Sequence, residues 1–76
     1  MNKFRRKELA KVVSLMEQAR DLLEMVRDDE QDAFDNMPES FQGSERGETM
    51  EEYINIMDEI LEYLDTEVLQ DIVDGF

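Results

Sequence analysis

Two blocks of apolar residues recur at alternating intervals of three and four positions, and this spacing constrains the fold more than any other feature. In the first block these residues are Leu9, Val12, Met16, Ala19, Leu23 and Val26. In the second block they are Met50, Tyr53, Met57, Ile60 and Leu64. Such steps keep the side chains of each block on one side of an α-helix. The chain has no Val- and Thr-rich alternating segment typical of a strand, so the sequence predicts an all-α fold built from two long helices.

The ends of the first helix carry recognisable signals. Asn2 is a suitable N-cap residue, because its side chain can accept a hydrogen bond from a free backbone N–H. Pro38 cannot continue a helix and disfavours helical geometry in the residue before it. The first helix is therefore expected at about residues 2–34, followed by a loop at about 35–48.

The second helix is predicted at about residues 49–73. Thr49 followed by Glu52 has the spacing of a capping box, in which two side chains satisfy free N–H groups at the helix start. A break near 65–66 is the alternative, because Asp and Thr at these positions can restart a helix. A loop of this length lets the two helices fold back on each other, so one domain over residues 1–76 is predicted, an antiparallel two-helix hairpin.

Each helix has an apolar arc about 180° wide, which is wider than one partner helix covers. The arcs are widened by residues that lie beside the main stripe and are predicted to form an oligomer interface: Leu15, Leu22, Ile56 and Tyr63. Exposed apolar patches of this kind usually mark interfaces. A homodimer that forms a four-helix bundle would bury them.

The charge is strongly acidic and unevenly distributed. The chain has 8 Lys and Arg against 21 Asp and Glu, a net charge of −13. Residues 1–27 carry a net +3, from seven basic and four acidic residues, whereas residues 28–76 carry −16, from one and seventeen. Such a surface repels nucleic acid and anionic membrane and favours a protein partner with a basic surface. In the hairpin the basic start of the first helix is expected beside Asp71 and Asp74.

The amino-acid composition argues against several functional classes. The chain has no Cys and no His, so it lacks thiolate and imidazole groups for catalysis or metal binding. Its serines and threonines have no histidine to activate them, and there is no glycine-rich phosphate loop. We therefore expect a protein that is not an enzyme and has no cofactor and no metal site. No apolar run is long enough to span a membrane, and a cytoplasmic location is expected.

The acidic stretch before the proline has a partial match to a calcium-binding EF-hand loop. Its register starts at Asp28 and places acids at Asp28, Glu30, Asp32 and Glu39. However, the turn position is Ala33 instead of Gly, and Pro38 falls where the exit helix should already have begun. Weak binding of divalent cations to the crowded carboxylates is the alternative, and it needs no EF-hand loop.

A row of acidic side chains follows one face of the second predicted helix. Its members are Glu51, Asp58, Glu62 and Asp65. Steps of three or four residues separate neighbouring carboxylates by roughly 5–6 Å, a spacing similar to that of phosphates along one nucleic-acid strand. One hypothesis is that this row imitates a phosphate backbone and binds a basic groove, and another is that it only keeps the protein dissolved.

The segment "DDEQDAFDNMPESFQGSERGE" and the helix after it resemble short acidic helical proteins of bacteria and their phages or prophages. The resemblance spans about residues 5–65 and is most specific between Asp32 and Glu48. It implies two amphipathic helices around this segment and an accessory protein that inhibits a host nucleic-acid-binding or defence protein. It implies no catalytic or binding residue. The sequence thus predicts a non-enzymatic acidic protein-binding module, with a structural assembly or dimerisation module as the alternative.

Overall fold

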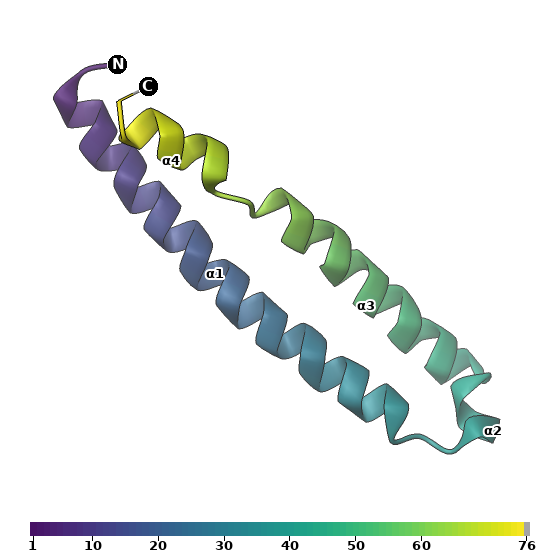
Figure 1. Cartoon of the computed structure of the whole chain (residues 1–76). Coiled ribbons are helices and arrows are strands. Elements are labelled where there is room, and N and C mark those ends of the chain that lie inside the picture. Colours follow the sequence, from purple (N-terminus) through teal and green to yellow (C-terminus); the bar gives the residue numbers. More distant parts are fainter. Residues whose placement is uncertain (76) are drawn as a thin grey trace.

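The computed structural model describes residues 1–75, and its elements are all helices. They are α1 (Lys3–Asp35), α2 (Glu39–Gln42), α3 (Glu45–Tyr63) and α4 (Glu67–Val73). No strand occurs among the described residues, so the prediction of an all-α fold is confirmed. Helices α3 and α4 run back along α1 in the opposite direction, and α2 lies at the turn between α1 and α3 (Figure 1). The molecule is long and thin, with extents of 58 × 14 × 13 Å.

A single line of side chains, which we call the seam, joins α1 to α3. Its residues are buried or half-buried: Leu9, Val13, Met16, Leu23, Arg27 and Phe34 on α1, and Gly47, Met50, Ile54, Met57, Leu61 and Leu64 on α3. They keep the three- and four-residue spacing that packs one helix against another. Among the described residues only two apolar side chains are buried, Val13 at 4% exposure and Ile54 at 5%. The core is therefore a line of contacts and not a filled volume.

The sequence pattern assigned part of the core to the wrong residues. Four apolar side chains expected in the main stripes remain substantially exposed: Val12, Val26, Tyr53 and Ile60. At these four positions the residue one place later lies in the seam instead, whereas the alternate residues of each predicted stripe, such as Met16 and Met57, are in the seam as expected. Two adjacent apolar lines are present on each helix, and the line that packs on α1 includes Arg27, which apolar periodicity does not count. This arginine belongs to the seam because Asp58 on α3 binds it.

The two ends of α1 are satisfied by side chains. Asn2 is the N-cap, and its Oδ1 accepts a hydrogen bond of 2.8 Å from the backbone N–H of Arg5, as predicted. At the other end, Gln42 Nε2 donates to the carbonyl oxygens of Phe34 and Met37, both at 3.1 Å. The carbonyl of Phe34 is one of the last four of α1, which a helix leaves without a partner of its own, and that of Met37 belongs to the turn after the helix. Gln42 therefore fixes the end of α1 to the turn.

The second long helix begins earlier than predicted. Helix α3 starts at Glu45 with Ser44 as N-cap, whose side chain accepts from Gly47 N at 3.4 Å. The loop predicted at 35–48 therefore contains α2 and the first turn of α3. Thr49 does not cap a helix, because it lies inside α3 and its hydroxyl donates to the carbonyl of Glu45 at 2.9 Å.

Gly47 has a packing role at the junction of α2 and α3. It is buried in the first turn of α3, against the end of α2. A Cβ atom at this position would lie 2.1 Å from the carbonyl oxygen of Gln42 and 2.7 Å from that of Phe41. Only a residue without a side chain allows the two backbones to approach this closely.

The single helix expected over residues 49–73 is also interrupted. Helix α3 ends at Tyr63 and α4 starts at Glu67, which is the break that the sequence offered as the alternative. Asp65 stabilises the restart, since its Oδ1 accepts a hydrogen bond of 3.0 Å from Glu67 N. Thr66 connects the break to α1 by donating to Glu17 Oε1 at 3.4 Å.

Candidate functional site

One broad side of the molecule carries an uncovered apolar surface, which we call the open apolar face. Its members are Val12, Leu15, Ala19, Leu22 and Val26 on α1, and Tyr53, Ile56, Ile60 and Tyr63 on α3. All nine are exposed, and the eight larger side chains are 44–84% exposed. No charged residue stands among these nine positions. The face is continuous in chemistry along both helices.

The two stripes of this face lie on the same side of the helix pair. The large stripe residues on each helix come one position before a seam residue, a turn of about 100° around the helix axis, and Ala19 continues the α1 stripe before the exposed Arg20. Because α1 and α3 run in opposite directions, the same turn carries both stripes to one side. The depression beside the turn supports this geometry, since Ala33 and Arg46, which precede Phe34 and Gly47, line it together.

The four residues predicted as an oligomer interface all belong to the open apolar face. Leu15 and Leu22 on α1 are 64% and 59% exposed, and Ile56 and Tyr63 on α3 are 45% and 84% exposed. The structure thus brings residues from both helices into one surface. The sequence predicts these four residues as an oligomer interface at the margins of the apolar arcs, and whether they form one is a proposal.

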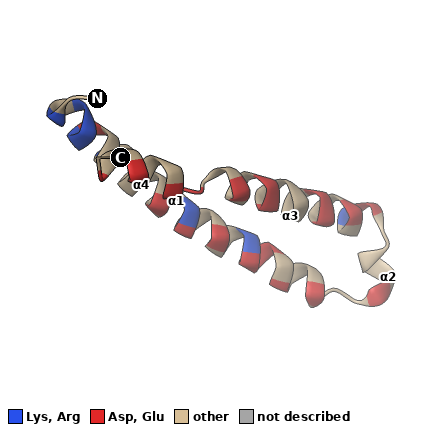
Figure 2. Cartoon of the chain, turned by 45° about the horizontal axis from the view of Figure 1, so that its top comes forward, with Lys and Arg blue, Asp and Glu red and all other residues tan. Residues whose placement is uncertain are grey.

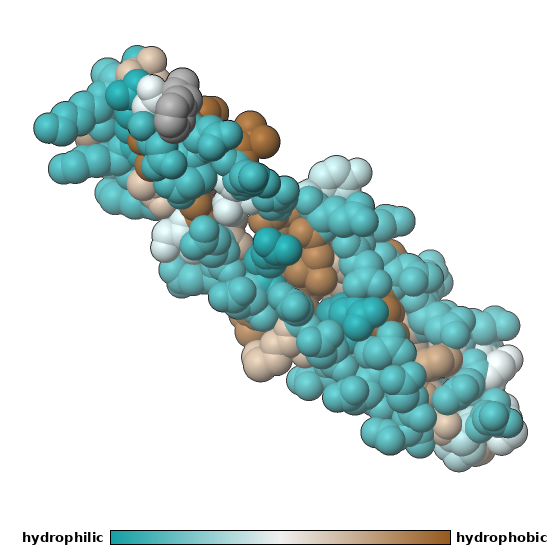
Figure 3. Space-filling model, viewed as in Figure 1, coloured by the Kyte–Doolittle hydropathy of each residue, from teal (hydrophilic) through white to brown (hydrophobic). Residues whose placement is uncertain are grey.

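The opposite side of the helix pair is polar. Its residues come one position after the seam, and they include all four members of the predicted acidic row: Glu51, Asp58 and Glu62 on α3, and Asp65 in the break that follows it. Figure 3 has the same direction of view as Figure 1, and in this view the polar side of the helix pair faces the reader. Figure 3 shows it as hydrophilic except for an apolar strip between the helices.

Two members of the acidic row are engaged within the molecule. Asp58 Oδ1 accepts a hydrogen bond of 2.8 Å from Arg27 Nε, and its Oδ2 lies 3.4 Å from Arg27 Nη2. This hydrogen bonding to Asp58, with its negative charge and a smaller contribution from Asp28, raises the pKa of Arg27 despite partial burial of the guanidinium. Asp65 accepts the backbone N–H at the start of α4. The row is therefore not four free carboxylates.

The positive charge of the chain is concentrated at one end of the molecule. Figure 2 shows the basic residues at the start of α1 close to α4, whereas the rest of the molecule is mainly acidic. Arg6 reaches the end of α4, where its Cζ lies 3.9 Å from the position of a Cβ on Gly75. Its Nε is buried and has no hydrogen-bond partner among residues 1–75. Among the described residues no ion pair within 4.0 Å joins this basic start to Asp71 or Asp74.

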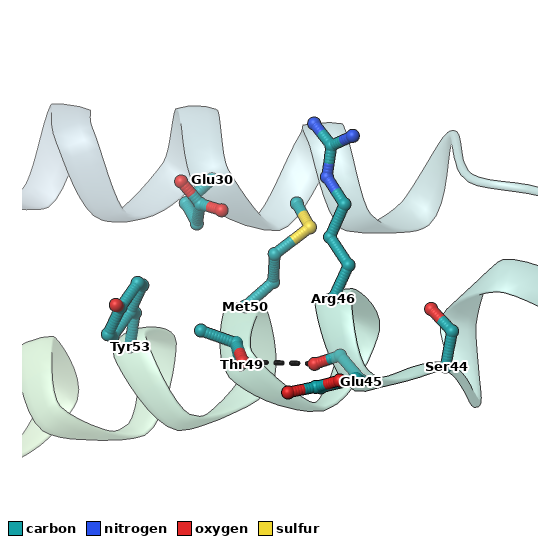
Figure 4. Close-up of a pocket in the computed structure, with 7 residues that line it drawn as sticks. All are labelled: Glu30, Ser44, Glu45, Arg46, Thr49, Met50 and Tyr53. Atoms are coloured by element: carbon teal, nitrogen blue, oxygen red, sulfur yellow. Dashed lines mark hydrogen bonds between the residues drawn. The ribbon is translucent and has the colours of Figure 1, made fainter.

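A shallow depression lies between α1 and the first turns of α3. Its lining includes Glu30 from α1 and Arg46, Met50 and Tyr53 from α3. Figure 4 shows the guanidinium of Arg46 extending toward α1, beside Met50. Arg46 is the one basic residue between positions 28 and 76. The depression opens broadly to solvent and encloses no group in the way an active site does.

The acidic stretch with the partial EF-hand register is helical. Asp28, Glu30 and Asp32 lie within α1, and Glu39 begins α2. A calcium loop has to curl around the ion, and a continuous helix cannot do so. Within residues 1–75 no cluster of three or more acidic side chains is arranged as a metal site. In the same range, no helix combines the length and the apolar character needed to cross a bilayer.

Comparison of the chain with protein-family models, with curated proteins and with solved structures gives no match. The resemblance to short acidic phage and bacterial proteins therefore stays a prediction. The functional argument rests on the two contrasting sides of the helix pair, one apolar and uncovered and the other acidic.

Proposed function

We propose that this chain is a non-enzymatic assembly module that forms a homodimer through its open apolar face. The observation that carries the proposal is the alignment of apolar stripes from α1 and α3 on one side, with eight large side chains 44–84% exposed. Two such faces packed together make a four-helix bundle, in which the antiparallel helices of each copy form one layer. The acidic sides of both copies then face solvent.

The weakness of the isolated core supports this proposal. Among the described residues, two apolar side chains are buried and thirteen large apolar side chains are exposed. A domain of this size gains only a few kcal/mol, about 3–5, from a single core, and exposed apolar surface usually marks an interface. Burial of the face in a dimer supplies the missing apolar contacts.

The size of the side that carries the face also fits a dimer. This whole side of the molecule, 58 by 14 Å, projects an area of roughly 800 Å², about the area that each partner buries in a standard protein interface, and the open apolar face occupies its middle part. A second copy presents the same apolar stripes at the same spacing, so the surface is complementary to itself in chemistry and in length. A twofold symmetric dimer is the commonest arrangement for such an interface.

The test measures molecular mass in solution by sedimentation equilibrium over a range of protein concentrations. The wild-type chain is expected to be a dimer, and the double variant Leu22→Gln, Ile56→Gln is expected to be a monomer at the same concentration. The matched control is Glu51→Gln, Glu62→Gln, which changes the polar side and should remain dimeric. A wild-type chain that is monomeric and well folded at all concentrations contradicts the proposal.

A second candidate function uses the acidic side. Glu51 and Glu62 are exposed on it, and in the dimer this side stays outward and available for a protein partner with a basic surface. Solvent-exposed ion pairs contribute only about 0–1 kcal/mol each, so recognition would depend on their sum and would weaken as salt rises. The salt dependence of self-association is the opposite, because salt screens the repulsion between two acidic chains and thereby strengthens the dimer.

The second candidate is tested with a variant in which all four acidic residues of the row become Gln or Asn. Capture of host proteins on the wild-type chain and on this variant is compared at low and high salt. A basic partner that binds the wild-type chain more than tenfold better, and only at low salt, supports recognition by charge. Equal binding by both chains removes it and leaves the acidic side with a role in solubility.

A further inference from the structure

Helix α1 has a symmetric apolar stripe. The middle of α1, which runs from residue 3 to residue 35, is Ala19. On the open apolar face, Leu15 and Leu22 lie almost equally far from Ala19 on either side, and Val12 and Val26 lie seven residues away on each side. The stripe therefore reads Val, Leu, Ala, Leu, Val in both directions.

The charges of α1 have the opposite symmetry. Residues 3–14 contain five Lys or Arg and one Glu, a net +4. The equivalent segment on the other side of Ala19, residues 24–35, contains six Asp or Glu and one Arg, a net −5. Turning a second copy of α1 end to end about Ala19 places each basic half against an acidic half. A helix with this pattern is complementary to itself in the antiparallel orientation only.

We infer that the two copies dock with α1 against α1, antiparallel, and with the twofold axis at Ala19. The inference rests on the proposed function and adds the orientation and the contacts of the dimer. Leu15 of each copy packs beside Leu22 of the other, and Val12 beside Val26. Ala19 meets its own equivalent, where its small side chain lets the two helices approach closely.

The apolar residues beside the break between α3 and α4 agree with the same axis, whereas Tyr53, Ile56 and Ile60 lie farther along α3 and do not meet their own equivalents about it. The hydrogen bond between Thr66 and Glu17 places the break between α3 and α4 beside the middle of α1. Tyr63 and Val68 flank this break, at 84% and 72% exposure, the two highest values among the large apolar side chains described. Val68 precedes the half-buried Leu69 by one position, the relation that defines the open apolar face. The axis brings Tyr63 of one copy to Val68 of the other.

The other face-to-face arrangement, with the two long axes parallel, is electrostatically unfavourable. Residues 15–64, which form the part of the molecule nearer the turn, contain sixteen acidic and three basic residues, a net −13. The remaining residues, at the end that holds the start of α1 and α4, contain five of each, and their net charge is zero. The parallel arrangement puts the two acidic parts side by side along their whole length, whereas the antiparallel arrangement places most of each acidic part opposite the end of the other copy that has no net charge.

Engineered cysteines distinguish the two orientations, because the chain has no cysteine of its own. Ala19→Cys is expected to form a disulfide-linked dimer under mild oxidation. A mixture of the Leu15→Cys and Leu22→Cys chains is expected to cross-link faster than either chain alone. Asp21→Cys, on the polar side of α1, is the control and should cross-link slowly. All of these side chains are exposed, so the substitutions leave the fold of the single chain intact, as circular dichroism can verify.

The outcomes separate the orientation from the proposal on which it rests. A dimer in which Leu22→Cys links preferentially to Tyr63→Cys has parallel long axes, and it overturns the inference while keeping the assembly module. A chain that sediments as a monomer and gives no cross-link above the Asp21→Cys control overturns both. Self-linking at Ala19 together with the mixed Leu15 and Leu22 product supports the antiparallel dimer.

Discussion

Replacing Gly47 by Ala should destabilise the protein far more than the loss of one glycine in a loop. The added Cβ would lie 2.1 Å from the carbonyl oxygen of Gln42 and 2.6 Å from its carbonyl carbon. Real Cβ atoms stay beyond about 3.0 Å from such atoms. The backbone of α2 must therefore move away from α3 by nearly 1 Å, and both partners are backbone atoms that cannot rotate aside.

The size of the effect follows from what this movement breaks. Overpacking of this kind costs typically 1–3 kcal/mol. Gln42 carries the two hydrogen bonds that hold the end of α1, each worth about 1 kcal/mol, and displacement weakens them. Alanine recovers about 1 kcal/mol because it favours helix more than glycine does. The expected net loss in the free energy of unfolding is about 2–3 kcal/mol, a large fraction of the stability of a small domain.

Urea unfolding followed by circular dichroism measures this loss, and Gly43→Ala is the matched control. No atom lies within 4 Å of a Cβ at Gly43, and its φ of −84° suits alanine. The control should be neutral or more stable by about 0.4–1 kcal/mol, because it loses less conformational entropy on folding. If the two variants unfold at the same urea concentration, the close packing of α2 on α3 is not what requires glycine at position 47.

Three further predictions concern the ends and the polar side of the helices. Asp65→Ala should cost about 1 kcal/mol and should speed amide hydrogen exchange in α4 only, whereas Asp71→Ala should not. Arg27→Gln should lower the melting temperature more than Arg20→Gln. Because the pKa of Arg27 is raised in the folded protein, its contribution to stability is fully present below the ordinary pKa of arginine and is lost only as the pH rises through the raised pKa. The difference between these variants should thus stay constant between roughly pH 6 and 9, and a change over that range would point to another group. Millimolar Ca²⁺ and Mg²⁺ should shift the melting temperature slightly and equally, because residues 28–39 do not form a calcium loop, and a large rise selective for Ca²⁺ would contradict this.

The helical character of the chain could be predicted because three- and four-residue spacing is a local property of the sequence. The choice of which apolar line packs inward could not. Val12 and Val13 are adjacent and chemically identical, and only the ion pair of Arg27 with Asp58 and the position of Phe34 near the turn select the line of Val13. These are contacts between residues distant in the sequence, which periodicity within one helix does not report.

The turn that contains α2 shows a second limit of prediction from the sequence. Ser44 and Thr49 are both plausible N-caps, and the Glu that follows Thr49 by three positions favoured the wrong one. What decides is Gly47, which allows α2 to pack on the first turn of α3 only if that turn begins at Glu45. Gln42, Ser44 and Gly47 belong to the segment on which the resemblance to phage and bacterial proteins is most specific, and the structure gives each of them a role in building the turn.

The linear core determines the order in which native contacts can form. Closing a contact costs more entropy as the intervening chain grows, and here that length rises steadily with distance from the turn. The hydrogen bond from Gln42 to Phe34 spans eight residues, that from Arg27 to Asp58 spans 31, and that from Thr66 to Glu17 spans 49. The chain should therefore close like a zipper from the turn, with α4 docking last and opening first. Pulse-labelling of amides during refolding should show protection advancing from α2 toward α4, and any other order would mean that the dimer interface forms before the helix pair is complete.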